Sequence, residues 1–129
     1  MINELELNFI NNYIIKEKKK RLIYEFSNSK KKKDALMRFC HNVERIINNK
    51  FIHRKCNIEY LNKHFILFED VLVLSLDKIN GETCSYSEAL KHLNEQYMPV
   101  IIIGENAVII KAENEDVKDN IFILFNKAL

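Results

Sequence analysis

The chain has 129 residues, of which 47% are apolar and 29% charged, a composition typical of one folded domain and outside the disordered range. Its two glycines, at positions 81 and 104, exclude Gly-rich phosphate-binding loops and the G-x-S-x-G nucleophile elbow. We therefore expect a single domain over 1–129, mainly helical and basic over 1–68, and mixed β/α and acidic over 69–129.

Charge is divided unevenly along the chain. The formal net charge is +2, but residues 1–55 hold fourteen Lys and Arg against six Asp and Glu, a net of +8. Residues 56–129 hold six against twelve, a net of −6. Such asymmetry can mark an end of the protein that faces nucleic acid or a membrane. It can also arise without a partner, because the two halves can attract each other, or because an AT-rich coding sequence favours Lys over Arg.

The sequence contains no recognisable export or membrane signal. Glu4 and Glu6 follow Met1 where a secretory leader needs positive charge and then an apolar run. The apolar stretch Val71 to Leu76, which Ser75 interrupts, is far shorter than the ~20 residues that span a bilayer. Three widely spaced cysteines suit a reducing compartment, so we expect a cytoplasmic protein with no membrane partner.

Helical periodicity dominates the N-terminal half. Apolar residues recur at helical spacing from Leu5 to Ile14 and again from Leu22 to Phe26, with the run Lys16–Arg21 between them. Because the second set falls on roughly the opposite face, we expect a break or kink there.

A second helix is predicted to follow Asn28 and Ser29, either of which can cap it, and to end near Asn48. Its apolar face would consist of Leu36, Phe39, Cys40, Val43 and Ile47. A short third helix is predicted from Asn57, with helix or strand over Phe65 to Phe68.

The C-terminal half has the pattern of a sheet. Asn80-Gly81 is the dipeptide that a type I′ hairpin turn prefers, and Ser85 to Glu88 has the form of a capping box for one helix. Strands are predicted over Val71–Leu76, Glu82–Cys84, Val100–Ile103, Ala107–Lys111 and Ile121–Phe125. The fold class is therefore α+β, with an N-terminal layer of two to three helices followed by a small, mostly antiparallel sheet with one crossover helix. If Ile121–Phe125 lies at the sheet edge, two copies can pair through it as a homodimer.

Metal binding and nucleophilic catalysis have weak candidates. Cys40, His41, His53 and Cys56 crowd one region, but their spacing matches no structural zinc site, and Cys40 and His41 diverge by about 100° on a helix. We predict a core cysteine, surface histidines, no metal site and no cofactor. An acidic run that ends at Asp119 precedes the last strand. It is most simply a solvated loop, or a set of charges that protects the edge of an apolar strand from pairing with another chain.

Basic residues give the most informative pattern. A lysine run is predicted in the first turn of the second helix, where free N–H groups also attract anions, and arginines continue it along the exposed face. The candidate anion or nucleic-acid site is Lys30, Lys31, Lys32, Lys33, Arg38 and Arg45. The run Lys16–Arg21 adds to it if the first two helices lie side by side.

Three functional hypotheses stay open. The first is a small intracellular, non-catalytic binding or regulatory protein whose basic helical half contacts nucleic acid or another acidic partner. An immunity-type or inhibitor protein that binds a protein partner by charge complementarity is the second. The third is an enzyme with a non-motif site around Arg38 and His41; because no catalytic constellation is present in the sequence, we favour the first two.

Overall fold

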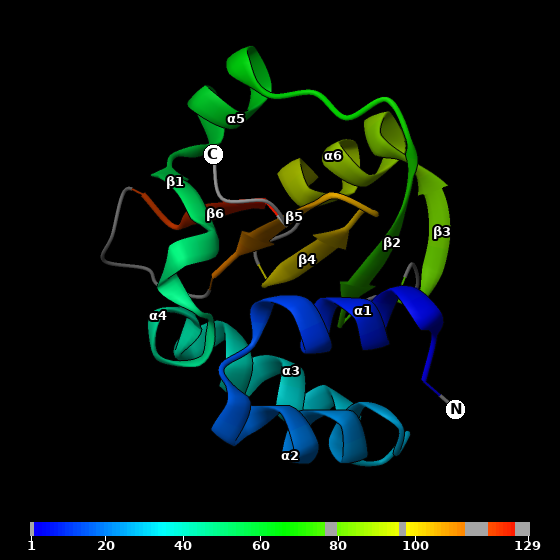
Figure 1. Ribbon diagram of the computed structural model, residues 1–129. Helices are drawn as coiled ribbons and strands as arrows, with labels where there is room; N and C mark the ends of the chain where they lie inside the picture. The colour runs from blue at the N-terminus through cyan, green and yellow to red at the C-terminus, as the bar shows by residue number, and fades with distance from the viewer. Residues whose placement is uncertain (1, 77–79, 96–97, 113–118, 126–129) are drawn as a thin grey trace.

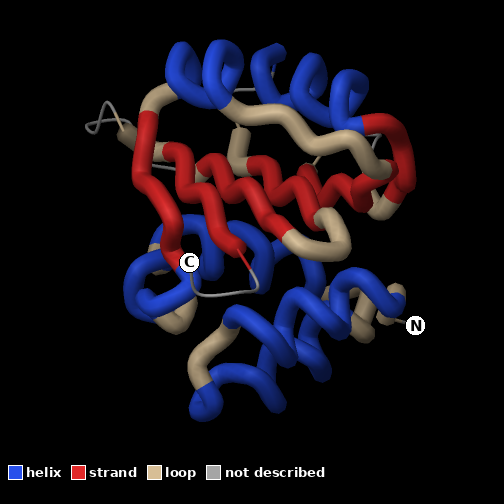
Figure 2. The backbone as a smooth tube through the Cα atoms, turned by 45° about the horizontal axis from the view of Figure 1, so that its top comes forward, coloured by secondary structure: helices blue, strands red, loops and turns tan. Residues whose placement is uncertain are grey.

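The computed structural model places a six-stranded antiparallel sheet between two groups of helices, giving three layers (Figures 1 and 2). It describes residues 2–76, 80–95, 98–112 and 119–125. Across the sheet the strands follow the order β1 (Ile52–Cys56), β6 (Ile121–Phe125), β5 (Ala107–Lys111), β4 (Val100–Ile103), β2 (Asp70–Ser75) and β3 (Glu82–Ser85).

Two helical layers cover the two faces of the sheet, as Figure 2 shows. The first, which we call the N-terminal helical layer, contains α1 (Glu4–Tyr13), α2 (Lys16–Phe26), α3 (Lys32–His41) and α4 (Val43–Ile46). The second contains α5 (Ile58–His64) and α6 (Tyr86–Glu95). The predicted α+β class is confirmed, including α6 as the helix that crosses from β3 over β2 to β4.

Burial of both sheet faces explains why the four central strands, β2, β4, β5 and β6, are mostly apolar rather than alternating. In β2, Leu72 and Leu74 pack against the N-terminal helical layer, whereas Val71 and Val73 pack against the layer of α5 and α6. An antiparallel sheet with one wet face would carry polar residues at every second position. Each fully buried Leu, Ile or Val contributes about 1.5–3 kcal/mol relative to an exposed one, so burial on both faces of the sheet stabilises the fold.

The break predicted between the first two helices is confirmed, and it is held in place by the end of α4. Ile14 and Ile15 are extended, with ψ of 143° and 148°. The Ile15 amide donates to the carbonyl of Ile46 at 2.9 Å, and the Asn48 amide donates to the carbonyl of Tyr13 at 2.8 Å. These bonds fix the first turn of α2 beside α4, although the two helices are far apart in sequence.

The second predicted helix differs from the observed one at both ends. Lys31 and Lys32 each donate their amide to the carbonyl of Asn28 at 3.0 Å, and the Lys30 amide donates to Asn28 Oδ1 at 3.0 Å. This turn delays the start of α3 to Lys32. The helix then stops at His41, because Asn42 adopts φ −131° and ψ 33°, and only the four-residue α4 follows.

The predicted starts of the other two helices, at Asn57 and Ser85, are confirmed, and both residues act as side-chain caps. Asn57 Oδ1 accepts from the Tyr60 amide at 2.9 Å at the start of α5, and Ser85 Oγ accepts from the Glu88 amide at 3.2 Å at the start of α6. Residues 65–68 form neither helix nor strand.

The predicted type I′ turn is wrong, and the last strand does not lie at the sheet edge. Pairing of β2 with β3 ends at Val73 and Glu82, so the connection is longer than a two-residue turn. Gly81 has φ 78° but Asn80 has no positive φ, which excludes type I′. The strand Ile121–Phe125 is paired on both sides, by β1 and β5, so it is not an edge strand, and the condition for pairing two copies through it is not met.

In the part of the chain that the structure describes, no helix is both long and apolar enough to cross a membrane.

Candidate anion-binding cavity

The six basic residues singled out in the sequence lie at two separate places. Lys30 to Lys33 surround the start of α3, whereas Arg38 and Arg45 lie at its other end, in α3 and α4. The break at Asn42 interrupts the continuous stripe expected along one helix. The six residues therefore form two basic groups rather than one surface.

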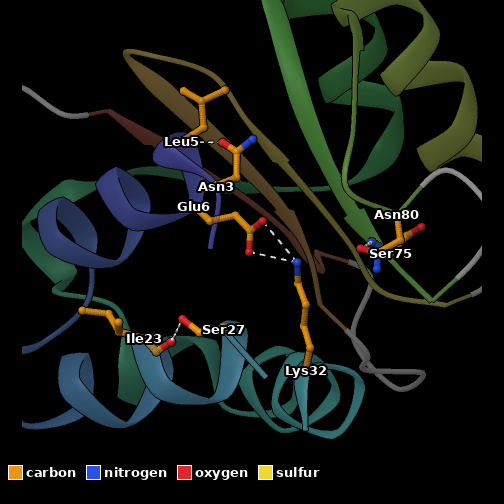
Figure 3. Close-up of polar contacts among 8 residues, drawn as sticks. All are labelled: Asn3, Leu5, Glu6, Ile23, Ser27, Lys32, Ser75 and Asn80. Atoms are coloured by element: carbon orange, nitrogen blue, oxygen red, sulfur yellow. Dashed lines mark hydrogen bonds and ion pairs between the residues drawn. The ribbon is translucent and has the colours of Figure 1, made fainter. Parts of the chain in front are cut away.

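At the start of α3, most of the groups expected to bind an anion are already engaged. The amides of Lys30, Lys31 and Lys32 donate to Asn28, as described above. Lys31 Nζ lies 5.5 Å from the centroid of the Tyr24 ring. Lys32 Nζ lies 3.0 Å and 3.1 Å from the two carboxylate oxygens of Glu6 in α1 (Figure 3). This end of α3 is thus organised by internal contacts.

At the other end of α3, four cationic side chains from three helices surround one surface cavity of about 250 Å³. We call it the basic cavity. Lys18 and Arg21 come from α2, Arg38 from α3 and Arg45 from α4. The remaining lining residues are Leu22, Asn42 and Ile46. The prediction that the lysine run of α2 would join the arginines is confirmed for Lys18 and Arg21, because α2 packs against α3.

A buried carboxylate holds two of these cations in place. Glu25 is 7% exposed, and its Oε1 accepts from Arg38 Nη2 and lies 3.4 Å from Arg21 Nε. Arg21 and Glu25 are one helical turn apart on α2. Because Arg38 belongs to α3, its contact with Glu25 ties α2 to α3. A guanidinium fixed in this way loses less conformational entropy when it binds a ligand.

The other two cations of the basic cavity are uncommitted. Lys18 and Arg45 are exposed, and neither side chain forms an ion pair or hydrogen bond with any residue that the structure describes. The cavity therefore carries four positive charges against the single negative charge of Glu25. An anion that entered it would relieve the mutual repulsion of these cations and gain charge-assisted hydrogen bonds from the arginines.

Phosphate groups suit this geometry. Arginine presents a planar fork of N–H donors that matches phosphate oxygens, and lysine adds a point charge. The cavity also stands on apolar side chains, Leu22 and Ile46, which lower the local dielectric constant beneath the charges. The arrangement can therefore bind a phosphate without any Gly-rich loop.

The cysteine and histidine candidates do not gather at one place. Cys40 belongs to the core beneath the N-terminal helical layer, and Cys56 belongs to the core on the opposite face of the sheet, so they cannot share an ion. His53 packs on the ring of Phe125 at 4.7 Å between centroids. Among the described residues, no three His, Cys, Asp or Glu side chains form a cluster able to hold a metal. Burial raises the pKa of the Cys56 and Cys84 thiols, which favours the unreactive protonated form.

Arg38 and His41, the residues of the enzyme hypothesis, do not share one cavity. Each lines a different one of two neighbouring cavities. Arg38 lies at the basic cavity, and His41 lines a larger cavity on the other side of the α3–α4 break. Asp119, a carboxylate from the acidic half, lines that second cavity with His41.

The role of Glu25 was missed in the sequence, although its position four residues after Arg21 is a local signal for an ion pair. Its second partner, Arg38, follows from tertiary packing and has no local signal.

The fold defines an α+β protein, and the basic cavity is the candidate anion-binding site of its N-terminal helical layer. In comparisons with known proteins, the chain matches no family model, no curated protein and no solved structure.

Proposed function

We propose that this protein is a non-catalytic binding protein whose N-terminal helical layer contacts the phosphate groups of a nucleic acid through the basic cavity. The observation that carries the proposal is the convergence of Lys18, Arg21, Arg38 and Arg45 on one cavity. A protein that binds phosphates releases condensed counterions, so its affinity falls steeply with salt.

The charge distribution supports this proposal. The cavity lies in the half of the chain with a net charge of +8, so the field around it favours approach of a polyanion. Two of its cations are preorganised by Glu25, and the other two are free to contact a ligand. A solvated lysine surface would not require a buried carboxylate that aligns two guanidiniums.

Fluorescence anisotropy of a labelled single-stranded RNA and a labelled duplex at several salt concentrations tests the proposal. The key variant is Lys18→Gln/Arg45→Gln, which removes the two exposed, uncommitted cations. Each lost phosphate contact lowers the slope of log affinity against log salt by about 0.7 for a single strand, so we expect a fall of about 1.4. Thermal unfolding of the variant should match that of the parent, because both side chains are exposed.

The matched control is Lys63→Gln/Lys91→Gln, which removes two exposed cations from the opposite helical layer. Its salt slope should equal that of the parent. A further variant, Lys30→Gln/Lys33→Gln, distinguishes the two basic groups. If binding is absent at low salt, or if the control loses as much slope as the cavity variant, the proposal is wrong. If the loss follows Lys30 and Lys33, the site lies at the start of α3.

A second candidate function is supported by a different observation. Phe68 is 95% exposed and Ile66 is 61% exposed, in the segment between α5 and β2. Exposed aromatic side chains of this kind are common centres of protein interfaces. An immunity-type or inhibitor protein would use them to hold a protein partner. A co-purifying complex that survives moderate salt and is lost in Phe68→Ser, with Lys18→Gln/Arg45→Gln still bound, would favour this function.

A further inference from the structure

A second cavity adjoins the basic cavity at the break between α3 and α4. It has a volume of about 350 Å³, and Asn42 and Arg45 line both cavities. We call it the junction cavity. Its other walls include Cys40 of α3, Lys55 of β1 and Phe122 of β6, together with Asp119 and Asn120, which precede β6. A ligand that occupies the basic cavity therefore has a neighbouring space for a further group.

The junction cavity has a mostly polar lining with a smaller apolar wall. Phe122 is 4% exposed and Cys40 is 1% exposed, so both belong to the core and form a fixed wall. Lys55 Nζ is engaged twice, because it lies 2.8 Å from Glu44 Oε1 and 5.3 Å from the centroid of the Phe122 ring. The cavity therefore offers a ligand one apolar wall and a larger number of polar side chains.

Two polar side chains at this cavity have capacity left for a ligand. The Asn120 amide nitrogen donates to the Ala112 carbonyl at 3.3 Å, which leaves its oxygen as an acceptor. The Asp119 carboxylate makes no hydrogen bond or ion pair with any other residue that the structure describes. Both are acceptors, so the cavity is suited to a flat group that presents N–H donors.

Resting on the proposed function, we propose that the partner is a single strand, and that one unpaired base enters the junction cavity while an adjacent phosphate lies in the basic cavity. Arg45, which lines both, would contact the phosphate beside the base. Guanine fits best, because its N1–H and N2–H donors are adjacent and match the two oxygens of a carboxylate. A base in a duplex is stacked and paired and cannot enter, so this site selects single strands.

The test uses a labelled ten-nucleotide oligouridine whose central nucleotide is guanosine, uridine or an abasic unit, and the duplex formed by the guanosine strand. We expect the guanosine strand to bind about tenfold more tightly than the abasic strand, a gain typical of one recognised base. The duplex should bind no better than the abasic strand. The variant Asp119→Asn should reduce the ratio of guanosine to abasic affinity to near one, whereas Asp70→Asn, a carboxylate at the start of β2, should leave that ratio unchanged.

The outcomes separate the two proposals. Absence of salt-dependent binding by every oligonucleotide, abasic included, overturns the proposed function. Binding that depends on Lys18 and Arg45 but is equal for guanosine, uridine, abasic and duplex ligands overturns the single-strand inference alone. A uniform rise in all affinities in Asp119→Asn, with the guanosine ratio intact, also overturns it, because the carboxylate then acts only through its charge.

Discussion

The ion pair between Glu6 and Lys32 offers a quantitative test of how the N-terminal helical layer is held together. Lys32 Nζ lies 3.0 Å from Oε2 and 3.1 Å from Oε1 of Glu6, and the side chains are 21% and 4% exposed, respectively (Figure 3). Only the contact with Oε1 has hydrogen-bond geometry, so Oε2 is held by charge alone. The pair joins α1 to the start of α3.

The perturbation is Glu6→Gln, which keeps the shape of the side chain and removes its charge. Loss of one partner of a buried ion pair costs about 3–5 kcal/mol, because the other charge is left without compensation. Since a fifth of the Lys32 side chain is exposed, its ammonium can turn partly toward water. We therefore expect a loss of about 2 kcal/mol in the free energy of unfolding.

Urea unfolding at pH 7 of the parent, Glu6→Gln, Lys32→Met and the double variant forms a double-mutant cycle, which measures the interaction free energy of the two side chains. The double variant should be more stable than the sum of the single losses predicts, by more than about 1 kcal/mol of coupling. Oligonucleotide binding should be unchanged in Lys32→Met, because Lys32 is committed to Glu6. Single losses below about 0.5 kcal/mol, within the range of ordinary surface substitutions, would refute the reasoning.

The remaining predictions also concern stability. Burial raises the pKa of Tyr13 and Tyr86 to about 12, above the usual value of 10. The stability that each neutral tyrosine provides is therefore complete below pH 10 and is lost as pH rises toward 12. Over this range the free energy of unfolding should fall by about 3 kcal/mol per tyrosine. The Tyr86 hydroxyl has no hydrogen-bond partner among the described residues, so Tyr86→Phe should raise the free energy of unfolding by about 1 kcal/mol at pH 7. The variant should also lose less stability between pH 10 and pH 12 than the parent. Chemical denaturation at neutral and alkaline pH measures both effects, and a lower stability at pH 7 would contradict the prediction. Gly81→Ala should cost about 1 kcal/mol through its φ of 78° alone, since no atom lies within 4 Å of the added methyl; in thermal unfolding, an unchanged midpoint would count against this. Phe39→Ala, which removes a fully buried ring in edge contact with Phe9, should cost about 3–5 kcal/mol in urea unfolding, and a cost below about 1 kcal/mol would show that the core there can collapse.

The elements with strong local signals were predictable from the sequence. Helices α5 and α6 begin at Asn57 and Ser85 as expected, because a side-chain acceptor two or three residues before free amides is a local feature. By contrast, β1 was missed. Four of its five residues, Ile52 to Lys55, are partly or fully exposed, and the strand forms only by pairing with β6. Tertiary contacts, rather than local sequence preference, therefore decide that residues 52–56 form a strand.

The candidate site was predictable in composition but not in position. Arg38 and Arg45 lie with Lys18 and Arg21 of α2 at the basic cavity. At the start of α3, the amides of Lys30, Lys31 and Lys32 donate to Asn28, so an anion site there stays a prediction that depends on the lysine side chains. The convergence of Lys18 on Arg45 depends on bonds between Ile15 and Ile46 and between Asn48 and Tyr13. Contacts of this kind leave no periodicity in the sequence.

The pairing of β1 with β6 has a consequence for the order of folding. Cys56 of β1 lies opposite Ile121 of β6. Since β1 precedes β6 by more than sixty residues in the chain, β1 has no strand partner until β6 has been synthesised. In between, β4, β5 and β6 are consecutive along the chain and pair as neighbours, so they close short loops. We therefore expect the sheet to assemble from its middle outward, with β1 docking last. During translation, the strand edge of β6 is exposed until β1 covers it, and this interval is when the chain is most open to aggregation or to capture by a chaperone.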